Sequence, residues 1–118
     1  MSYQWSLSPE ADDGIFRQTQ WYLVEVPDGG EELAARWNSG LEMALEKLAL
    51  RPHAHGFAPE NGKWLPQHQI RQMLYRPWKS GVGWRVLYAI DEKAKLVTVL
   101  QVRHEHRRWM HDAEEGAA

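Results

Sequence analysis

The sequence predicts an α+β fold, in which an N-terminal strand and an antiparallel helix hairpin precede three antiparallel strands that complete one sheet. Three observations lead to this class. Apolar and polar residues alternate at the N-terminus, apolar residues recur every three or four positions through two long segments, and alternation returns in three runs after residue 68. With 118 residues the chain can build one core, so we expect a single domain over residues 1–118.

The N-terminal strand and the first helix are predicted from adjoining patterns. Alternation over residues 3–7 is typical of a short half-buried strand. Ser8 followed by Pro9 is typical of a helix start, because the hydroxyl can cap a free N–H and proline is tolerated at the first helical position. Apolar residues at helical spacing extend this helix over residues 9–24.

A second helix is predicted over residues 31–50, after a turn of composition Pro-Asp-Gly-Gly at residues 27–30. The short connection makes the two helices an antiparallel hairpin. Gly40 lies inside the second helix, where glycine costs roughly 1 kcal/mol relative to alanine. We interpret Gly40 as the place where the helices cross closely.

Three strands are predicted in the second half of the chain, at residues 69–75, 84–91 and 96–103. The last is the most apolar, so we expect it to be central and buried on both faces. The first strand is expected at the edge of the sheet or beside the last strand. Residues 51–67 form a long loop, a kind of segment that is often functional or mobile in compact domains.

Composition limits the class of protein. The chain has no cysteine, which excludes disulfides and thiolate metal sites. No apolar run approaches the roughly 20 residues that span a bilayer, and the N-terminus lacks the pattern of a signal peptide. We therefore expect a soluble cytoplasmic protein without a membrane partner.

Charge is distributed unevenly along the chain. Residues 1–60 hold 4 Lys or Arg and 10 Asp or Glu, a balance of −6, whereas residues 61–118 hold 10 and 6, a balance of +4. Five of the 6 histidines follow His53. A basic half rich in histidine suggests an anionic partner, although the helices could simply carry solvated acids. His53 and His55 are interpreted as solvated, and we expect no metal and no cofactor.

Five segments fall on these elements: residues 7–11 (LSPEA), 45–52 (LEKLALRP), 70–74 (IRQML), 84–90 (WRVLYAI) and 99–104 (VLQVRH). These segments and the order of the elements together resemble the RelE/ParE superfamily of bacterial toxins from toxin–antitoxin modules. The resemblance covers nearly the whole chain. It implies one of two activities, since RelE-like members cut messenger RNA in the ribosome and ParE-like members poison DNA gyrase. It also implies a partner, an antitoxin that wraps the toxin, and the chain could form a homodimer.

The resemblance also suggests catalytic residues. Arg85 matches the strand arginine that contacts the phosphate at the cleaved bond in RelE-like nucleases, and Arg71 falls near a basic position on the preceding strand. His104 matches a C-terminal histidine that some nucleases use as acid or base, and His106 lies in the same region. The chain departs from the most basic nucleases at Met73, which stands at an expected basic position.

Cleavage of RNA by its 2′-hydroxyl needs a base, an acid and a cation for the charge on the phosphate. We hypothesise that Arg85 and Arg71 hold the phosphate while His104 or His106 moves the proton, since arginine binds phosphate oxygens in pairs and histidine titrates near neutrality. The hypothesis requires these side chains to converge on one concave surface. Further nucleic-acid contacts are expected from Arg103, Arg107, Arg108, Lys79, Trp78 and Trp109.

Other interpretations of the same residues remain open. Arg85 could pair with a carboxylate such as Asp91 or Glu92, and Trp84 and Tyr88 are expected in the core. The protein could poison gyrase through its helix hairpin and C-terminal tail, or it could be a non-toxic interaction module. We place RNA cleavage ahead of gyrase poisoning because of the histidines and arginines near the last strand. An exposed sheet face and grooves left by the helices would accept the antitoxin.

Overall fold

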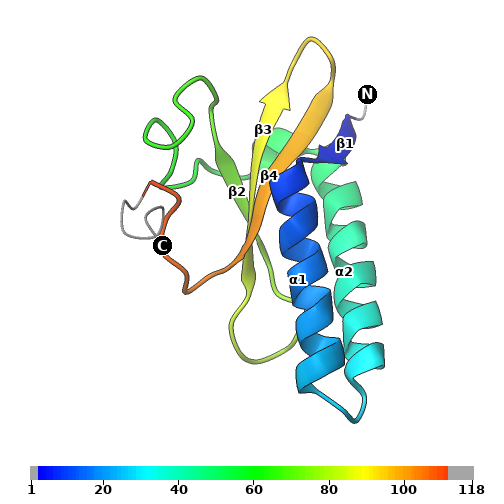
Figure 1. The fold of residues 1–118 in the computed structure, drawn as a ribbon. Coiled ribbons are helices and arrows are strands. Elements are labelled where there is room, and N and C mark those ends of the chain that lie inside the picture. The colour runs from blue at the N-terminus through cyan, green and yellow to red at the C-terminus, as the bar shows by residue number, and fades with distance from the viewer. Residues whose placement is uncertain (1–2, 112–118) are drawn as a thin grey trace.

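The computed structural model describes residues 3–111 and has the predicted α+β class (Figure 1). Element boundaries agree with the sequence predictions to within two residues. Within the described range, neither helix has the length and apolarity needed to cross a membrane. In chain order the elements are β1 (Gln4–Leu7), α1 (Pro9–Glu25), α2 (Gly30–Leu50), a 3-10 turn (Pro52–Ala54), β2 (Arg71–Tyr75), β3 (Trp84–Asp91) and β4 (Leu96–His104).

The four strands form one mixed sheet in the order β1-β4-β3-β2. β1 pairs with β4 in parallel, and the two other pairings are antiparallel. β4 is therefore central and β1 lies at the edge beside it, as the sequence predicts. The expected burial of both faces of β4 is wrong, because Leu96, Thr98 and Leu100 are only half-buried. The register of β3 and β4 shifts between Leu87 and Tyr88, which marks a bulge in the ladder.

Ser8 begins α1 and also joins it to the sheet. Its hydroxyl accepts a hydrogen bond from the Ala11 N–H at 3.0 Å, which is the predicted N-cap. The same hydroxyl donates to the Leu100 carbonyl of β4 at 2.9 Å. One side chain therefore sets both where α1 begins and how it lies against the central strand.

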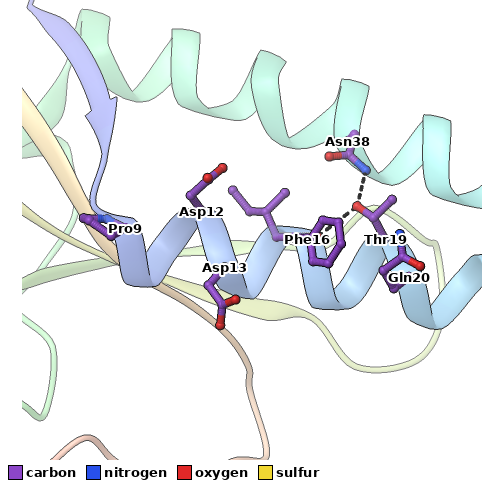
Figure 2. A pocket seen from close by; sticks show the side chains of 8 residues that line it. Pro9, Asp12, Asp13, Phe16, Thr19, Gln20 and Asn38 are labelled. Carbon is purple, nitrogen blue, oxygen red and sulfur yellow. Dashed lines mark hydrogen bonds between the residues drawn. The ribbon is translucent and has the colours of Figure 1, made fainter.

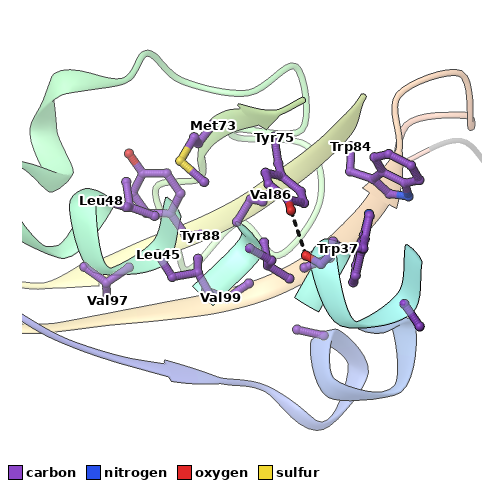
Figure 3. Close-up of a cluster of buried hydrophobic side chains, with 14 of the residues drawn as sticks. Trp37, Leu45, Leu48, Met73, Tyr75, Trp84, Val86, Tyr88, Val97 and Val99 are labelled. Atoms are coloured by element: carbon purple, nitrogen blue, oxygen red, sulfur yellow. Dashed lines mark hydrogen bonds between the residues drawn. The ribbon is translucent and has the colours of Figure 1, made fainter. Parts of the chain in front are cut away.

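Both helices cover one face of the sheet (Figure 1). The core lies between them, with Trp37 of α2 beside Tyr75 and Trp84 of the sheet (Figure 3). Burial of apolar side chains on this scale is the main force that holds the two layers together. The other core residues are Ala11, Tyr22, Ala34, Leu41, Leu45, Leu48, Met73, Val86, Tyr88, Val97, Val99 and Val102.

The middle of the opposite face of the sheet is covered by the protein itself. The loop before β2 and the C-terminal segment after β4 (residues 105–111) lie over it, away from the helices (Figure 1). Ala58, Ile70 and Leu87 are buried there, packed against Trp64, Leu65, Leu100 and Met110. The expectation of an exposed sheet face is therefore wrong around Leu87, because the long loop folds back onto β3.

Gly40 faces the sheet and not the other helix. A Cβ at this position would collide with the Tyr75 hydroxyl, which donates to the Trp37 carbonyl at 2.7 Å. The prediction that Gly40 marks the helix crossing is wrong. The close approach of the helices is at Gly30, where a Cβ would collide with the Tyr22 carbonyl of α1.

We expect Gly40→Ala to lower the free energy of unfolding by about 1–3 kcal/mol, because the added methyl overpacks the site and outweighs the better helix propensity of alanine. In a Tyr75→Phe background, where the obstructing hydroxyl is absent, the same change should be neutral or stabilising. Urea unfolding of the four proteins measures both effects. A stabilised Gly40→Ala single variant would contradict this explanation of the glycine.

Candidate functional site

The side chains of β3 point alternately to the two faces of the sheet. Trp84, Val86 and Tyr88 face the helices and belong to the core. Arg85 and Leu87 point to the opposite face, beneath the loop before β2. The predicted alternation of this strand is correct, and it decides where the candidate residues lie.

Arg85 is held in a buried ion pair. Its guanidinium donates through Nη1 and Nη2 to both carboxylate oxygens of Glu60, with an Nη1–Oε2 distance of 3.0 Å. Its Nε donates to the Gln72 amide oxygen at 2.9 Å. Arg85 is 5% exposed and Glu60 is 0% exposed. The guanidinium therefore has carboxylate and amide partners in the positions that a phosphate would occupy.

Glu60 is held ionised by this arrangement. Burial would raise the pKa of its carboxyl, but the hydrogen bonds from Arg85 and from the Met110 N–H, together with the Arg85 charge, bring the pKa below its ordinary value. The Met110 N–H lies 3.0 Å from Oε2 of Glu60. A carboxylate from the long loop thus joins β3 to the C-terminal segment.

Arg103 lies beside Arg85 and is directed into the same interior. The two residues are opposite each other in the β3–β4 register, and Arg103 is also buried. Its guanidinium donates to the Met110 sulfur and to the Arg108 carbonyl. The predicted nucleic-acid contact of Arg103 is therefore replaced by contacts that fold the C-terminal segment over the sheet.

Arg71 lies at the other end of the sheet from His104. In the β3 register Arg71 stands opposite Tyr88 and His104 stands opposite Trp84, which separates them by roughly 13 Å along the strand. Arg71 donates to the His55 carbonyl, and its guanidinium lies 4.3 Å from the centroid of the Phe57 ring. The predicted convergence of Arg71, Arg85 and His104 is wrong. Arg85 is buried on the face of the sheet away from the helices, and Arg71 and His104 lie at opposite ends of the sheet.

A different group of predicted residues does come together, where β4 ends. The ring centroids of His104 and His106 are 5.6 Å apart, and the His106 N–H donates to Nδ1 of His104 at 3.3 Å. This bond places the proton of a neutral His104 ring on Nε2. Glu105 lies between the two histidines in the sequence. Its carboxylate accepts a hydrogen bond from the Gly83 N–H and forms an ion pair with Arg76 at 3.2 Å. The Gly83 bond, and then the Arg76 charge, lower the pKa of Glu105.

The remaining predicted contacts divide between two places. Trp78 and Lys79 lie in the connection between β2 and β3, and Trp78 lines the same groove as His104. Arg107, Arg108 and Trp109 lie on the exposed C-terminal segment, where the Trp109 ring stacks on His111 at 5.4 Å. The structure therefore brings Trp78 and His104 to one groove, whereas Arg108 is joined to Arg103 through its backbone carbonyl.

The groove beside His104 was not predicted. It has a volume of about 520 Å³ and lies between α1, the β2–β3 connection and the ends of β3 and β4. Its lining is mostly apolar and aromatic. The residues that line it are Gln18, Trp21, Tyr22, Trp78, Gly81, Val82, Trp84 and His104.

A second groove of about 540 Å³ runs between the two helices on the side away from the sheet (Figure 2). The Asn38 amide donates to the Thr19 hydroxyl at 2.9 Å and ties the helices together there. Asp12, Asp13 and the exposed ring of Phe16 line the groove. It holds an apolar ring between polar side chains, which suits contact with another protein more than chemistry.

One member of these sites could have been found from the sequence. Glu60 is the only acidic residue between Glu46 and Asp91, so it was the carboxylate within the loop that could neutralise a buried arginine. Asp91 and Glu92, the expected partners of Arg85, lie elsewhere: Asp91 caps the β3–β4 turn, and Glu92 bonds Tyr3 and His53. Across residues 3–111, no three His, Asp or Glu side chains are grouped closely enough to hold a metal ion.

Comparison with known proteins finds a likeness of fold among solved structures. No protein-family model matches the chain, and no curated protein matches it. Among solved structures, a chain of the toxin–antitoxin complex RelBE2 from Mycobacterium tuberculosis matches over 88% of this chain and 99% of that one, with 20% identity and a TM-score of 0.48. A likeness of this degree does not assign an activity.

Proposed function

We propose that this protein is the toxin of a toxin–antitoxin pair, that it inhibits growth by binding a protein target, and that a cognate antitoxin protein neutralises it. Support comes from the sequence segments that resemble the RelE/ParE superfamily and from the predicted order of strand, helix hairpin and three strands, which the fold has. The proposal depends on the function implied by that resemblance.

The buried ion pair of Arg85 with Glu60 is the observation that favours binding over RNA cleavage. A nuclease that uses this arginine must present its guanidinium to a phosphate in solvent. Here the guanidinium is bound by Glu60 and Gln72 beneath the protein's own loop. Cleavage through Arg85 would require a buried ion pair to open before substrate could bind, and an unpaired buried charge is costly.

The helix hairpin offers a surface for a protein partner. Phe16 and Val24 of α1 are 60% and 68% exposed, and Met43 of α2 is also exposed. Large apolar side chains in solvent mark a site of protein association when they form one contiguous patch. We assign these residues to contact with the target, and gyrase is the first target to test.

One observation favours RNA cleavage as a second candidate. His104 and His106 lie with their rings 5.6 Å apart near the exposed end of β4, so one imidazole could act as base and the other as acid. This candidate uses two predicted catalytic residues and dispenses with Arg85 and Arg71.

One set of variants separates these functions. We expect induction of the wild-type chain to stop growth, and co-expression of a small adjoining reading frame to restore it. His104→Ala with His106→Ala should remain toxic if the protein acts by binding, whereas Phe16→Asp with Val24→Asp should lose toxicity. Assays with purified protein should show gyrase-dependent DNA breaks and intact translated messages.

Two other outcomes would contradict the proposal that the protein acts by binding. Loss of toxicity and of message cleavage in the double histidine variant, with DNA left intact, would replace binding by RNA cleavage. Normal growth on induction of the wild-type chain would contradict both functions and leave an interaction module of the same fold. Circular dichroism of each variant excludes misfolding as the cause.

A further inference from the structure

The groove beside His104 has the size and walls of a ligand site. Its volume of about 520 Å³ falls within the roughly 300–1,000 Å³ of small-molecule sites in proteins. Four aromatic rings line it, contributed by α1, the β2–β3 connection and β3. Figure 1 shows that connection turning beside α1, which brings segments more than 50 residues apart in the sequence to one place.

The rings are fixed in position before any ligand arrives. Tyr22 is buried and meets Trp21 and Trp78 edge-on, with centroids 5.5 Å and 6.3 Å apart. Trp84 is buried and meets His104 edge-on at 5.7 Å. Edge-to-face contacts hold rings at defined angles, so a ligand that enters does not have to order these walls. Trp21 is 53% exposed and offers a ring surface to solvent.

Two polar side chains line the groove and can read a planar polar ligand. The Gln18 amide has both donors and an acceptor. His104 receives the His106 N–H on Nδ1, so its neutral ring has a donor at Nε2. Aromatic surfaces with a few donors and acceptors are how proteins bind a nucleobase, because every base has a π-face and a polar edge.

The charge around the groove favours an anion. None of the eight lining residues is acidic. The Arg36 guanidinium lies 5.2 Å from the Trp78 ring centroid, and the exposed Lys79 follows Trp78. Glu105, the acid beside His104, is engaged by Gly83 and Arg76. Cations at the rim of an aromatic groove suit a base that carries a phosphate.

We propose that this groove binds a nucleotide, with the base against Trp21 and Trp78, its polar edge at Gln18 and His104, and its phosphate near Arg36 and Lys79. The ligand is either a free mononucleotide or one nucleotide of a single strand, which share this chemistry. The site does not depend on the proposed function, because neither growth inhibition nor an antitoxin enters the argument.

Isothermal titration calorimetry with adenosine 5′-monophosphate, adenosine and a five-nucleotide oligoadenylate tests the site. We expect one saturable site for the monophosphate and weaker binding of adenosine. Trp21→Ala and His104→Ala should each weaken binding, the first by roughly 5- to 150-fold, the range that loss of base stacking implies. Arg36→Gln should weaken binding of the monophosphate and leave that of adenosine unchanged.

The matched control is Phe57→Ala, which removes another exposed aromatic ring, at the Arg71 end of β2, and should bind like wild type. Tighter binding of the oligonucleotide than of the monophosphate assigns a single strand, and equal binding assigns a free nucleotide. The proposal is overturned if neither binds at millimolar concentration, if Trp21→Ala and His104→Ala bind like wild type, or if adenosine binds as tightly as its monophosphate.

Discussion

Replacing Arg85 by methionine is expected to lower the free energy of unfolding by about 3–5 kcal/mol, because Glu60 would be left buried and charged without its partner. Glu60 has no exposed surface, and both of its oxygens receive hydrogen bonds from the guanidinium. Glu60→Leu should be similarly damaging, since it leaves the Arg85 charge buried and the Met110 N–H without its acceptor. Urea unfolding of each purified variant measures these losses.

The double variant Glu60→Leu with Arg85→Met is the matched control. Because both charges are removed together and the space is refilled with apolar atoms, it should be far less destabilised than the sum of the single variants. A coupling free energy near zero would show that the pair does not act as a unit. In that case Arg85 would not be committed to a structural role, and the argument against Arg85 as a phosphate ligand would fail.

The ion pair of Glu60 and Arg85 makes the free energy of unfolding depend on pH. The pKa of Glu60 is lower in the folded protein than the ordinary 4.5, so the folded state favours the ionised form. This contribution to stability is fully present above about pH 4.5 and is lost as the pH falls through the folded-state pKa. The wild-type chain should therefore lose stability on acidification more steeply than the double variant, and parallel pH profiles would contradict this.

The predicted fold rested on local patterns that the structure retains. Ser8 caps α1 because its hydroxyl is the acceptor nearest the free N–H groups of the first turn, and a short-range rule of this kind does not depend on the rest of the chain. Alternation along β3 placed Trp84 and Arg85 on opposite faces for the same reason. The last strand, which is the most apolar by sequence, lies inside the sheet with a strand paired to each of its edges.

The predicted site failed where long-range folding decides the outcome. The sequence indicates that Arg85 points to the face of the sheet away from the helices, but it does not indicate which segment covers that face. A loop residue 25 positions earlier, Glu60, covers it, and the loop has no periodic pattern from which its path could be predicted. Likewise helical spacing along α1 does not indicate that Trp21 lines a groove with Trp78, a residue more than 50 positions later.

Replacing Trp37 by alanine is expected to lower the free energy of unfolding by about 3–5 kcal/mol, the range for deleting a large buried aromatic side chain. Trp37 is fully buried, and its ring meets those of Tyr75 and Trp84 at centroid distances of 5.8 Å and 5.5 Å (Figure 3). The substitution leaves a cavity at the point where α2 packs on the sheet. Guanidinium chloride unfolding measures the loss.

Trp37→Phe is the informative comparison. The indole Nε1 of Trp37 is buried and has no hydrogen-bond partner within residues 3–111, so phenylalanine removes an unsatisfied donor while it keeps a ring against Tyr75 and Trp84. Its loss of stability should therefore be much smaller than that of Trp37→Ala. Because Trp84 contacts both Trp37 and His104, nucleotide binding should survive in Trp37→Phe and weaken in Trp37→Ala. Equal binding by the two variants would show that the back wall of the groove does not depend on the core behind it.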